Sequence, residues 1–256
     1  MKHMFSRRQA VRGLLLGTAA VKLVETPTEA YATDNSPVGQ PGECTLFPQA
    51  IEGPYYFDRK LIRSDIREGR PGLSTIMLLT VIDATTCKPM TGARVDVWHA
   101  DARGVYSGYA HQGDDRRIST TDEIYLRGTQ MTDGGGRVLF RTIYPGWYPG
   151  RTPHIHVKVF LDELTLVTGQ IYFPDDLSKR IYREQVPYKQ RPNPDTDNNS
   201  DFIFKEGKRE GGGIVFTIDE TPDTLTASLV ISVDRTGSAA KRSMGWGPYL
   251  RQLIGL

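Results

Sequence analysis

Strand-length apolar segments recur between residues 75 and 233, and most of them end in turn-forming residues. The first, Thr75–Asp83, is rich in residues that favour strands, and the second, Ala93–Ala100, alternates strictly between two faces. Further segments of this kind are Tyr125–Met131, Val138–Ile143, His154–Leu161, Gly169–Phe173, Ile214–Ile218 and Leu225–Val233. Many short strands at close spacing, with almost no long helical period, predict an all-β sandwich with long loops and little helix.

Some pairings and connections can also be predicted. The turn Asp133–Gly136 lies between Tyr125–Met131 and Val138–Ile143, which predicts a β-hairpin. The last two strand segments are expected to close the fold as an antiparallel pair. Between them and the earlier strands, a short helix is expected over Tyr182–Val186 and an Asp- and Asn-rich loop over Asn193–Ser200.

The first 32 residues have the features of an export signal, in the expected order. Arg7 and Arg8 precede the apolar run Leu14–Val21, which is too short to span a bilayer comfortably. Ala30 and Ala32 then supply small residues at a cleavage site, so cleavage is expected after Ala32. We therefore expect recognition by the twin-arginine export machinery, a periplasmic or secreted location, and no stable membrane span in the mature form.

The rest of the chain divides by composition. Residues 33–43 are polar with several Pro and Gly and predict a linker, residues 44–235 carry all the predicted strands, and residues 236–256 form a C-terminal tail. In this tail Leu250, Leu253 and Ile254 lie at helical spacing. With 256 residues, 38% of them hydrophobic, the chain can bury one sizeable core, so a single domain is expected.

Charge and cysteine content indicate which binding partners and which covalent bond to expect. The net charge is +2 with 24% charged residues. The sequence contains no block of basic residues interleaved with aromatics, so no nucleic-acid partner is expected. The oligomeric state stays open. The chain has two cysteines, Cys44 and Cys87, and an oxidising compartment would let them pair, so a structural disulfide is predicted.

The stretch Tyr144–His156 brings together residue types that bind metals. His154 and His156 are two apart where a strand is predicted to begin, so both imidazoles point to the same face. In a chain with five histidines, this spacing favours ligation over a pair of core histidines. The preceding loop adds a phenol, Tyr148, and a cation, Arg151.

The oxygen donors indicate which metal is expected. Neither a carboxylate triad nor a third clustered histidine accompanies the two histidines, whereas Tyr106 and Tyr148 end two separate strand–loop junctions. Tyrosinate is a hard anionic donor that suits Fe(III) better than zinc, calcium or Fe(II). The residues themselves therefore favour a non-haem Fe(III) site.

These residues lie in motifs that resemble the intradiol ring-cleavage dioxygenases, which include the protocatechuate and catechol dioxygenases. The matching segments are Val95–Asp101, Gly104–Ser107, Pro145–Tyr148 and Arg151–His156, and the resemblance covers roughly residues 44–233. It implies an antiparallel β-sandwich of the intradiol dioxygenase type. It also implies an Fe(III) enzyme that uses O2 to cleave a catechol between its hydroxyl-bearing carbons, giving a cis,cis-muconate-type product.

The resemblance further implies a role for each matched residue. Four residues match the family's metal ligands: Tyr106, Tyr148, His154 and His156. Among them Tyr106 is similar to the equatorial tyrosinate, and Tyr148 to the axial tyrosinate that leaves during the reaction. Arg151 resembles the arginine beside the substrate ring, and Gln170 resembles the glutamine that lines the same pocket.

Several alternatives remain open from the sequence. Tyr109 competes with Tyr106, since both follow Gly in one loop, although the Gly-x-Tyr-Ser context favours Tyr106. Tyr144 competes with Tyr148, but it precedes Pro-Gly and is expected to pack behind the site. A non-catalytic binding module for a carbohydrate or protein partner would use Trp147 with Tyr148 and Tyr109 as a stacking platform. Extradiol cleavage would require Fe(II) and a carboxylate ligand, and neither ligand loop has a carboxylate at a matching position.

Overall fold

The computed structural model describes residues 44–209, 213–221 and 224–243. The predicted export signal and linker lie outside these described residues, as do Leu250, Leu253 and Ile254 of the tail.

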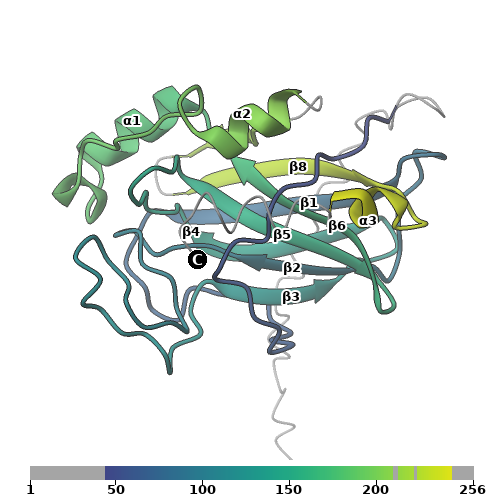
Figure 1. Ribbon diagram of the computed structural model, residues 1–256, viewed down its shortest axis with the longest axis horizontal. Coiled ribbons are helices and arrows are strands. Elements are labelled where there is room, and N and C mark those ends of the chain that lie inside the picture. Colours follow the sequence, from purple (N-terminus) through teal and green to yellow (C-terminus); the bar gives the residue numbers. More distant parts are fainter. Residues whose placement is uncertain (1–43, 210–212, 222–223, 244–256) are drawn as a thin grey trace, which may run out of the picture. The chain divides into compact units, whose positions relative to one another are not determined.

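Two four-stranded sheets make up the described β structure and pack face to face, which confirms the predicted β-sandwich (Figure 1). One sheet has the order β4-β1-β8-β7 and the other the order β3-β2-β5-β6. The strands are β1 (Ser74–Asp83), β2 (Arg94–Trp98), β3 (Arg127–Met131), β4 (Arg137–Ile143), β5 (His154–Leu161), β6 (Leu164–Tyr172), β7 (Thr217–Glu220) and β8 (Leu225–Val233).

The core lies between the sheets and follows from the alternation of the strands. On β1, Met77, Leu79 and Val81 point inward, and on β2, Val95 and Val97 do the same. All five are nearly inaccessible to solvent. The other face of β2 carries Asp96 and Trp98, which leaves that face of the sheet for a second, smaller aromatic cluster.

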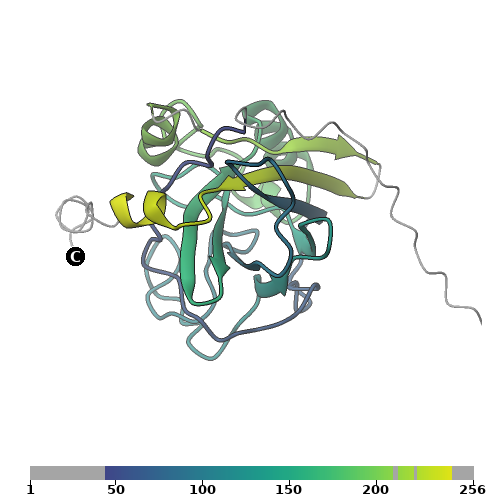
Figure 2. The ribbon, with the colours of Figure 1, turned by 90° about the vertical axis from the view of Figure 1, so that its right-hand side faces the viewer.

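The strand pairing differs from the expected antiparallel pattern at one place. β1 and β8 run parallel, with Thr75 opposite Leu225 and Asp83 opposite Val233. All other paired strands are antiparallel. The predicted antiparallel pairing of the last two strands is confirmed, because β7 pairs with β8 at the edge of its sheet (Figure 2). The predicted bounds Ile214–Ile218 are wrong: only Thr217 and Ile218 belong to β7, and Val215 bridges to Tyr172 instead.

The predicted hairpin around Asp133–Gly136 is wrong. β3 pairs with β2 in one sheet, whereas β4 pairs with β1 in the other. The glycine-rich turn makes this crossing possible, because Gly136 has a φ of 74° and its carbonyl accepts a hydrogen bond from Val81 of β1 (2.8 Å). The turn thereby delivers β4 to β1, so that Val138 and Phe140 enter the core from the opposite sheet.

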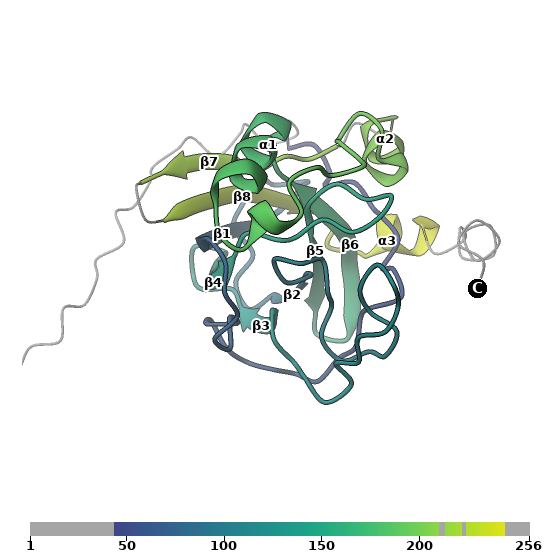
Figure 3. The same cartoon turned by 90° about the vertical axis from the view of Figure 1, so that its left-hand side faces the viewer.

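Helical structure is more extensive than predicted. Among the described residues the helices are α1 (Asp175–Glu184), a 3-10 turn (Tyr188–Gln190), α2 (Phe202–Arg209) and α3 (Ser238–Ser243). The expected helix over Tyr182–Val186 overlaps only the C-terminal end of α1. This helix starts at acidic residues and buries Leu177 and Ile181. Figures 1 and 3 show α1 and α2 on the same side of the sandwich.

Cys44 and Cys87 form a disulfide, as predicted. It ties the segment ahead of the core to the turn that follows β1. Separately, no helix among the described residues is long and apolar enough to cross a membrane.

Candidate metal centre

Four side chains from three parts of the chain meet at the beginning of β5. His154 and His156 lie on one face of this strand because side chains two residues apart point the same way. Tyr106 comes from the loop after β2, and Tyr148 from the loop that precedes β5. The structure thus brings together all four residues that the sequence suggested as ligands.

Their donor atoms converge within a narrow range of distances. The Nε2 atoms of His154 and His156 are 3.2 Å apart. The hydroxyl of Tyr148 lies 3.2 Å from His154 Nε2, and the hydroxyl of Tyr106 lies 3.2 Å from His156 Nε2 and 3.5 Å from His154 Nε2. His154, His156 and Tyr106 are buried, whereas Tyr148 is half-buried.

Both imidazoles are neutral, and His154 presents a lone pair to this point. The Nδ1–H of His154 donates to the backbone carbonyl of Thr152 (2.7 Å), which leaves its Nε2 unprotonated in the neutral ring. Burial lowers the pKa of His154 well below the usual value, and the nearby Arg151 adds to this effect. Burial also lowers the pKa of His156, with contributions from His154 and Arg151. Both rings are therefore neutral at physiological pH.

The donor set fits a hard metal ion. Metal–nitrogen and metal–oxygen bonds of about 2.0–2.2 Å place adjacent ligand atoms roughly 3 Å apart, which matches the observed spacing. Burial raises the pKa of both Tyr106 and Tyr148, so a cation is needed to hold either phenol as a tyrosinate. No cluster of three or more His, Cys, Asp or Glu suited to a metal occurs among the described residues, so the phenols are essential to this candidate site.

Aromatic packing holds two of the donors in place. The indole of Trp98 stacks on the His156 ring at 4.7 Å with an angle of 10° between planes. Tyr55 stacks on Tyr106 at 4.5 Å. Next to Tyr106, the side chain and carbonyl oxygens of Ser107 both accept hydrogen bonds from Arg127 (2.9 and 2.6 Å). The rings thus have little freedom to turn away from the common point.

The two tyrosines that competed for the ligand roles are bonded elsewhere. The Tyr109 hydroxyl donates to the carbonyl of Tyr56 (2.9 Å). Tyr144 lies in the main core, where its hydroxyl bonds to Ser178 (2.6 Å). The buried His99 is also separate from the centre, since its ring nitrogens contact Thr142 (2.6 Å) and its neighbour's carbonyl.

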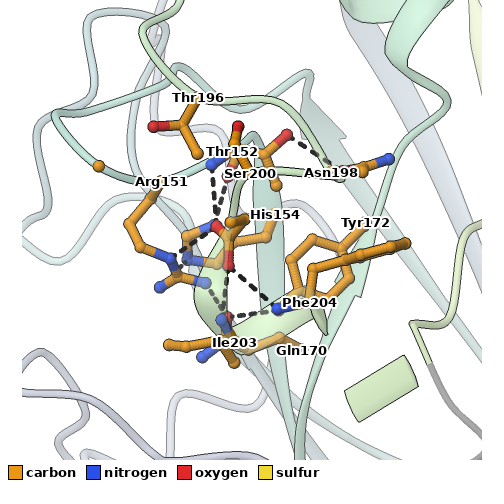
Figure 4. A network of polar contacts seen from close by, with 12 residues as sticks. Arg151, Thr152, His154, Gln170, Tyr172, Thr196, Asn198, Ser200, Ile203 and Phe204 are labelled. Atoms are coloured by element: carbon orange, nitrogen blue, oxygen red, sulfur yellow. Dashed lines mark hydrogen bonds and ion pairs between the residues drawn. The ribbon is translucent and has the colours of Figure 1, made fainter. Parts of the chain in front are cut away.

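Arg151 and Gln170 adjoin the four donors and contact each other. Arg151 Nη1 lies 3.4 Å from the Tyr148 hydroxyl, and Arg151 Nη2 donates to Gln170 Oε1 (2.5 Å). Gln170 reaches this position because β6 pairs with β5 and places it opposite His156. Figure 4 shows Arg151, Gln170 and Tyr172 turned toward one another around this network.

Sequence reasoning did not identify three residues that support the centre: Tyr55, Tyr172 and Asp201. The Tyr172 hydroxyl donates to Gln170 Oε1 (3.1 Å). Asp201 accepts from Arg151 Nε (2.8 Å) and is fully buried. A signal for Asp201 was available, because an Asp directly before an apolar run is typical of a helix N-cap, and α2 begins at the next residue.

Known proteins similar to this chain are dioxygenases. The sequence model of a family described as Dioxygenase matches residues 51–184, which is slightly more than half of the chain. The protocatechuate 3,4-dioxygenase beta chain of Burkholderia cepacia is 36% identical over 129 residues, covering 46% of this chain and 53% of that protein. Catechol 1,2-dioxygenase of Acinetobacter baylyi is 30% identical over 152 residues, covering 50% and 47%. The chain spans about half the length of these curated relatives.

Solved structures give fuller coverage. An intradiol ring-cleavage dioxygenase from Tetranychus urticae superposes with a TM-score of 0.65 at 35% identity, covering 75% of this chain and 95% of that one. The dioxygenase domain of a carbohydrate-binding fusion protein from Streptomyces sp. SirexAA-E gives a TM-score of 0.53 at 26% identity, covering 74% and 99%. The chain therefore belongs to the intradiol ring-cleavage dioxygenase family.

Proposed function

We propose that this protein is a non-haem Fe(III)-dependent intradiol dioxygenase that cleaves a catechol between its two hydroxyl-bearing carbons. O2 would be the co-substrate and a cis,cis-muconate-type acid the product. The observation that carries the proposal is the convergence of two neutral imidazole nitrogens and two phenol oxygens, 3.2–3.5 Å apart, beside a buried arginine. The names of the relatives support the substrate class, an ortho-diphenol, but not a particular catechol.

In this proposal Tyr106, Tyr148, His154 and His156 hold the iron. Bound Fe(III) would supply Lewis acidity, which lowers the pKa of the catechol hydroxyls and makes the aromatic ring reactive toward O2. The two histidines and Tyr106 are buried and packed, so we assign them to stay in place throughout.

Tyr148 is the donor best placed to move. It is half-buried and lies in a short turn in which Arg151 N donates to Tyr148 O (3.1 Å), with exposed Pro149 and Gly150 between them. We assign the Tyr148 phenolate oxygen as the acceptor of one catechol proton when substrate enters. Its departure as a neutral phenol would balance the charge of one catechol oxygen and would supply the base for that one proton.

Arg151 would then face the space that Tyr148 leaves. Its Nη1 lies within 3.5 Å of both the Tyr148 hydroxyl and His154 Nε2. Although burial alone would lower the pKa of Arg151, the neighbouring Tyr148 phenol and the Asp201 carboxylate raise it, so the guanidinium stays charged. A fixed cation at this edge would stabilise negative charge that develops on the substrate oxygens and ring.

A specific observation counts against the binding-module alternative. The Arg191 guanidinium covers the Trp147 ring at 3.9 Å, and the Trp147 indole N–H donates to the Arg191 carbonyl (2.9 Å). The Trp147 ring is therefore covered by Arg191 and does not offer an open stacking face.

Purified protein tests the proposed function directly. Iron content and visible absorption would be measured first, because tyrosinate bound to Fe(III) absorbs visible light. Catechol, protocatechuate, hydroxyquinol and substituted catechols would then be added while O2 uptake and product are followed. We expect a coloured protein that consumes one O2 for each ring cleaved. A colourless preparation that cannot be reconstituted with iron would overturn the proposal.

We further propose that the twin-arginine route exports this protein. Support comes from Arg7 and Arg8 ahead of a short apolar run and from a disulfide that suits an oxidising compartment. Replacing both arginines by lysine should retain the full-length precursor inside the cell, which fractionation and immunoblotting would detect. Unchanged export of the double variant would contradict this proposal.

A further inference from the structure

We infer that Asp201 is a positioning residue that fixes the orientation of Arg151 from the N-terminal end of α2. The inference deepens the proposed function and rests on it for the role of Arg151. It assigns a purpose to the Asp- and Asn-rich segment before α2, which the sequence indicated only as a loop.

Both carboxylate oxygens of Asp201 are fully engaged. Oδ2 accepts from Arg151 Nε (2.8 Å) and from the backbone N–H of Thr152 (3.0 Å). Oδ1 accepts from the backbone N–H groups of Ile203 (2.9 Å) and Phe204 (3.0 Å), which caps α2. One buried side chain thus connects the first turn of a helix to the loop that carries two site residues.

The hydrogen bonds of Arg151 hold two of its three guanidinium nitrogens. Its Nε is bound to Asp201, and its Nη2 is bound to Gln170, so Nη1 is the group presented to Tyr148 and His154. Because a guanidinium is planar and its donors form a fixed fork, holding two of the nitrogens determines where the third points. Without Asp201, Arg151 could rotate about its side-chain torsions and still contact Gln170.

The segment around Asp201 makes two further contacts to the same ligand loop. Asp195 accepts from the backbone N–H of Gly150 (3.1 Å), and Asn198 Oδ1 accepts from the Thr152 hydroxyl (3.1 Å). Figure 4 shows Thr152 and Asn198 in this arrangement. Residues 195–201 therefore hydrogen-bond to the loop from Tyr148 to Thr152 at successive positions. Among these residues, Asp201 is the one that contacts the Arg151 guanidinium.

Helix α2 is also held at the site independently of Asp201. Phe204 packs edge-on against Tyr172 at 4.9 Å, and the Tyr172 hydroxyl donates to Gln170 (3.1 Å). The helix therefore supports both partners of the Arg151–Gln170 pair. This second contact predicts that α2 stays docked when the carboxylate of Asp201 is removed.

The primary variant is Asp201→Ser, since serine is a good N-cap residue that can still cap α2 but is too short to bridge to Arg151. Asp201→Asn is the second variant, because its amide can accept from α2 while placing donors opposite Arg151 Nε and Thr152 N–H. Asp197→Asn is the matched control, since the Asp197 side chain bonds to Ser200 within its own turn.

For the iron-loaded protein we expect Asp201→Ser to lower kcat/KM for catechol by about 10–100-fold, the usual range for residues that orient catalytic groups. Iron content and visible colour should be retained, and Asp197→Asn should match the wild type. In an Arg151→Ala background, Asp201→Ser should change kcat/KM and anaerobic catechol affinity by less than about two-fold, because its effect passes through Arg151. Equal losses in both backgrounds, or no loss in the wild-type background, would overturn the inference.

A measurement on metal-free protein separates this inference from the proposed function. The Arg151 Nε–H should give a slowly exchanging NMR signal in the wild type and in Asp197→Asn, and the signal should be lost in both Asp201 variants. If the wild type fails to bind iron or cleave catechols while this signal behaves as expected, the proposed function fails and the positioning role stands. An Arg151 signal that survives in folded Asp201→Ser would overturn the positioning role alone.

Discussion

The Nε2 atoms of His154 and His156 face each other at 3.2 Å. Burial lowers the pKa of both rings and keeps them neutral. His154 already donates its Nδ1–H to Thr152, so its Nε2 can act only as an acceptor. The arrangement therefore brings the His154 lone pair, the His156 imidazole and two phenol hydroxyls together within one small volume. A bound cation would satisfy all four donors at once, and this makes the phenols the most informative residues to change.

Replacing one phenol by phenylalanine distinguishes the two candidate tyrosines of the loop after β2. Tyr106→Phe should abolish or strongly shift the visible absorption of the iron-loaded protein, because its hydroxyl lies 3.2 Å from His156 Nε2. Tyr109→Phe should leave the absorption intact, because the Tyr109 hydroxyl bonds to a backbone carbonyl instead. Visible spectra at equal iron content make the comparison, and the opposite pattern would show that Tyr109 is the ligand.

The sequence predicted the strands well because their alternation reflects a property that each segment carries by itself. Apart from the final pair, β7 and β8, it could not predict which strands pair. A Gly-rich turn between two apolar segments is compatible with a hairpin or with a crossing between sheets, and the choice depends on β1 being available to Gly136 and β4. The parallel pairing of β1 with β8 is likewise a contact between distant parts of the chain.

For the candidate site too, the residues close together in the sequence could be predicted, and the contacts between distant residues could not. His154 and His156 share a face by local geometry alone, and Tyr148 and Arg151 lie nearby in the sequence. Asp201 follows Arg151 by 50 residues, and only the docking of α2 brings its carboxylate to the guanidinium. No local pattern contains that information.

Trp98 offers a test of how packing supports the centre. It is buried, stacks on His156, and its indole N–H has no hydrogen-bond partner among the described residues. Trp98→Phe should change the free energy of unfolding by less than about 2 kcal/mol, because it keeps an aromatic ring and removes an unsatisfied donor. Trp98→Ala should cost about 3–5 kcal/mol and weaken iron retention, because it leaves a cavity behind His156.

Urea unfolding of both metal-free Trp98 variants, with iron content after dialysis, provides the measurement. Equal loss of stability in the two variants would mean that the indole N–H contributes through a contact that the structure does not contain.

The Cys44–Cys87 disulfide should contribute substantially to stability. The two cysteines are 43 residues apart, and closing a loop of that length in the unfolded chain corresponds to about 4 kcal/mol in the chain-entropy model. The Cys44→Ser/Cys87→Ser double variant should therefore unfold at lower urea concentration by roughly that free energy. Adding a reductant should destabilise the wild type and leave the double variant unchanged. Equal stability of the two proteins under oxidising conditions would refute this prediction.

His99 should make the metal-free protein sensitive to acid. Burial lowers its pKa from 6.5 to about 4, with Nδ1 donating to the Ala100 carbonyl (2.8 Å) and Nε2 accepting from Thr142 (2.6 Å). Between these values the unfolded chain binds more protons, so the contribution is present above pH 6.5 and is lost as the pH falls toward 4. A shift of this size corresponds to roughly 3 kcal/mol. Because His154 and His156 are present in the wild type and in His99→Gln alike, the difference between the two urea-unfolding profiles from pH 7 to 4.5 reports the titration of His99 together with its electrostatic effect on those two rings, whose pKa values it helps to lower. We expect the wild type to lose about 2–3 kcal/mol more than the variant over this range, and parallel profiles would contradict the assignment.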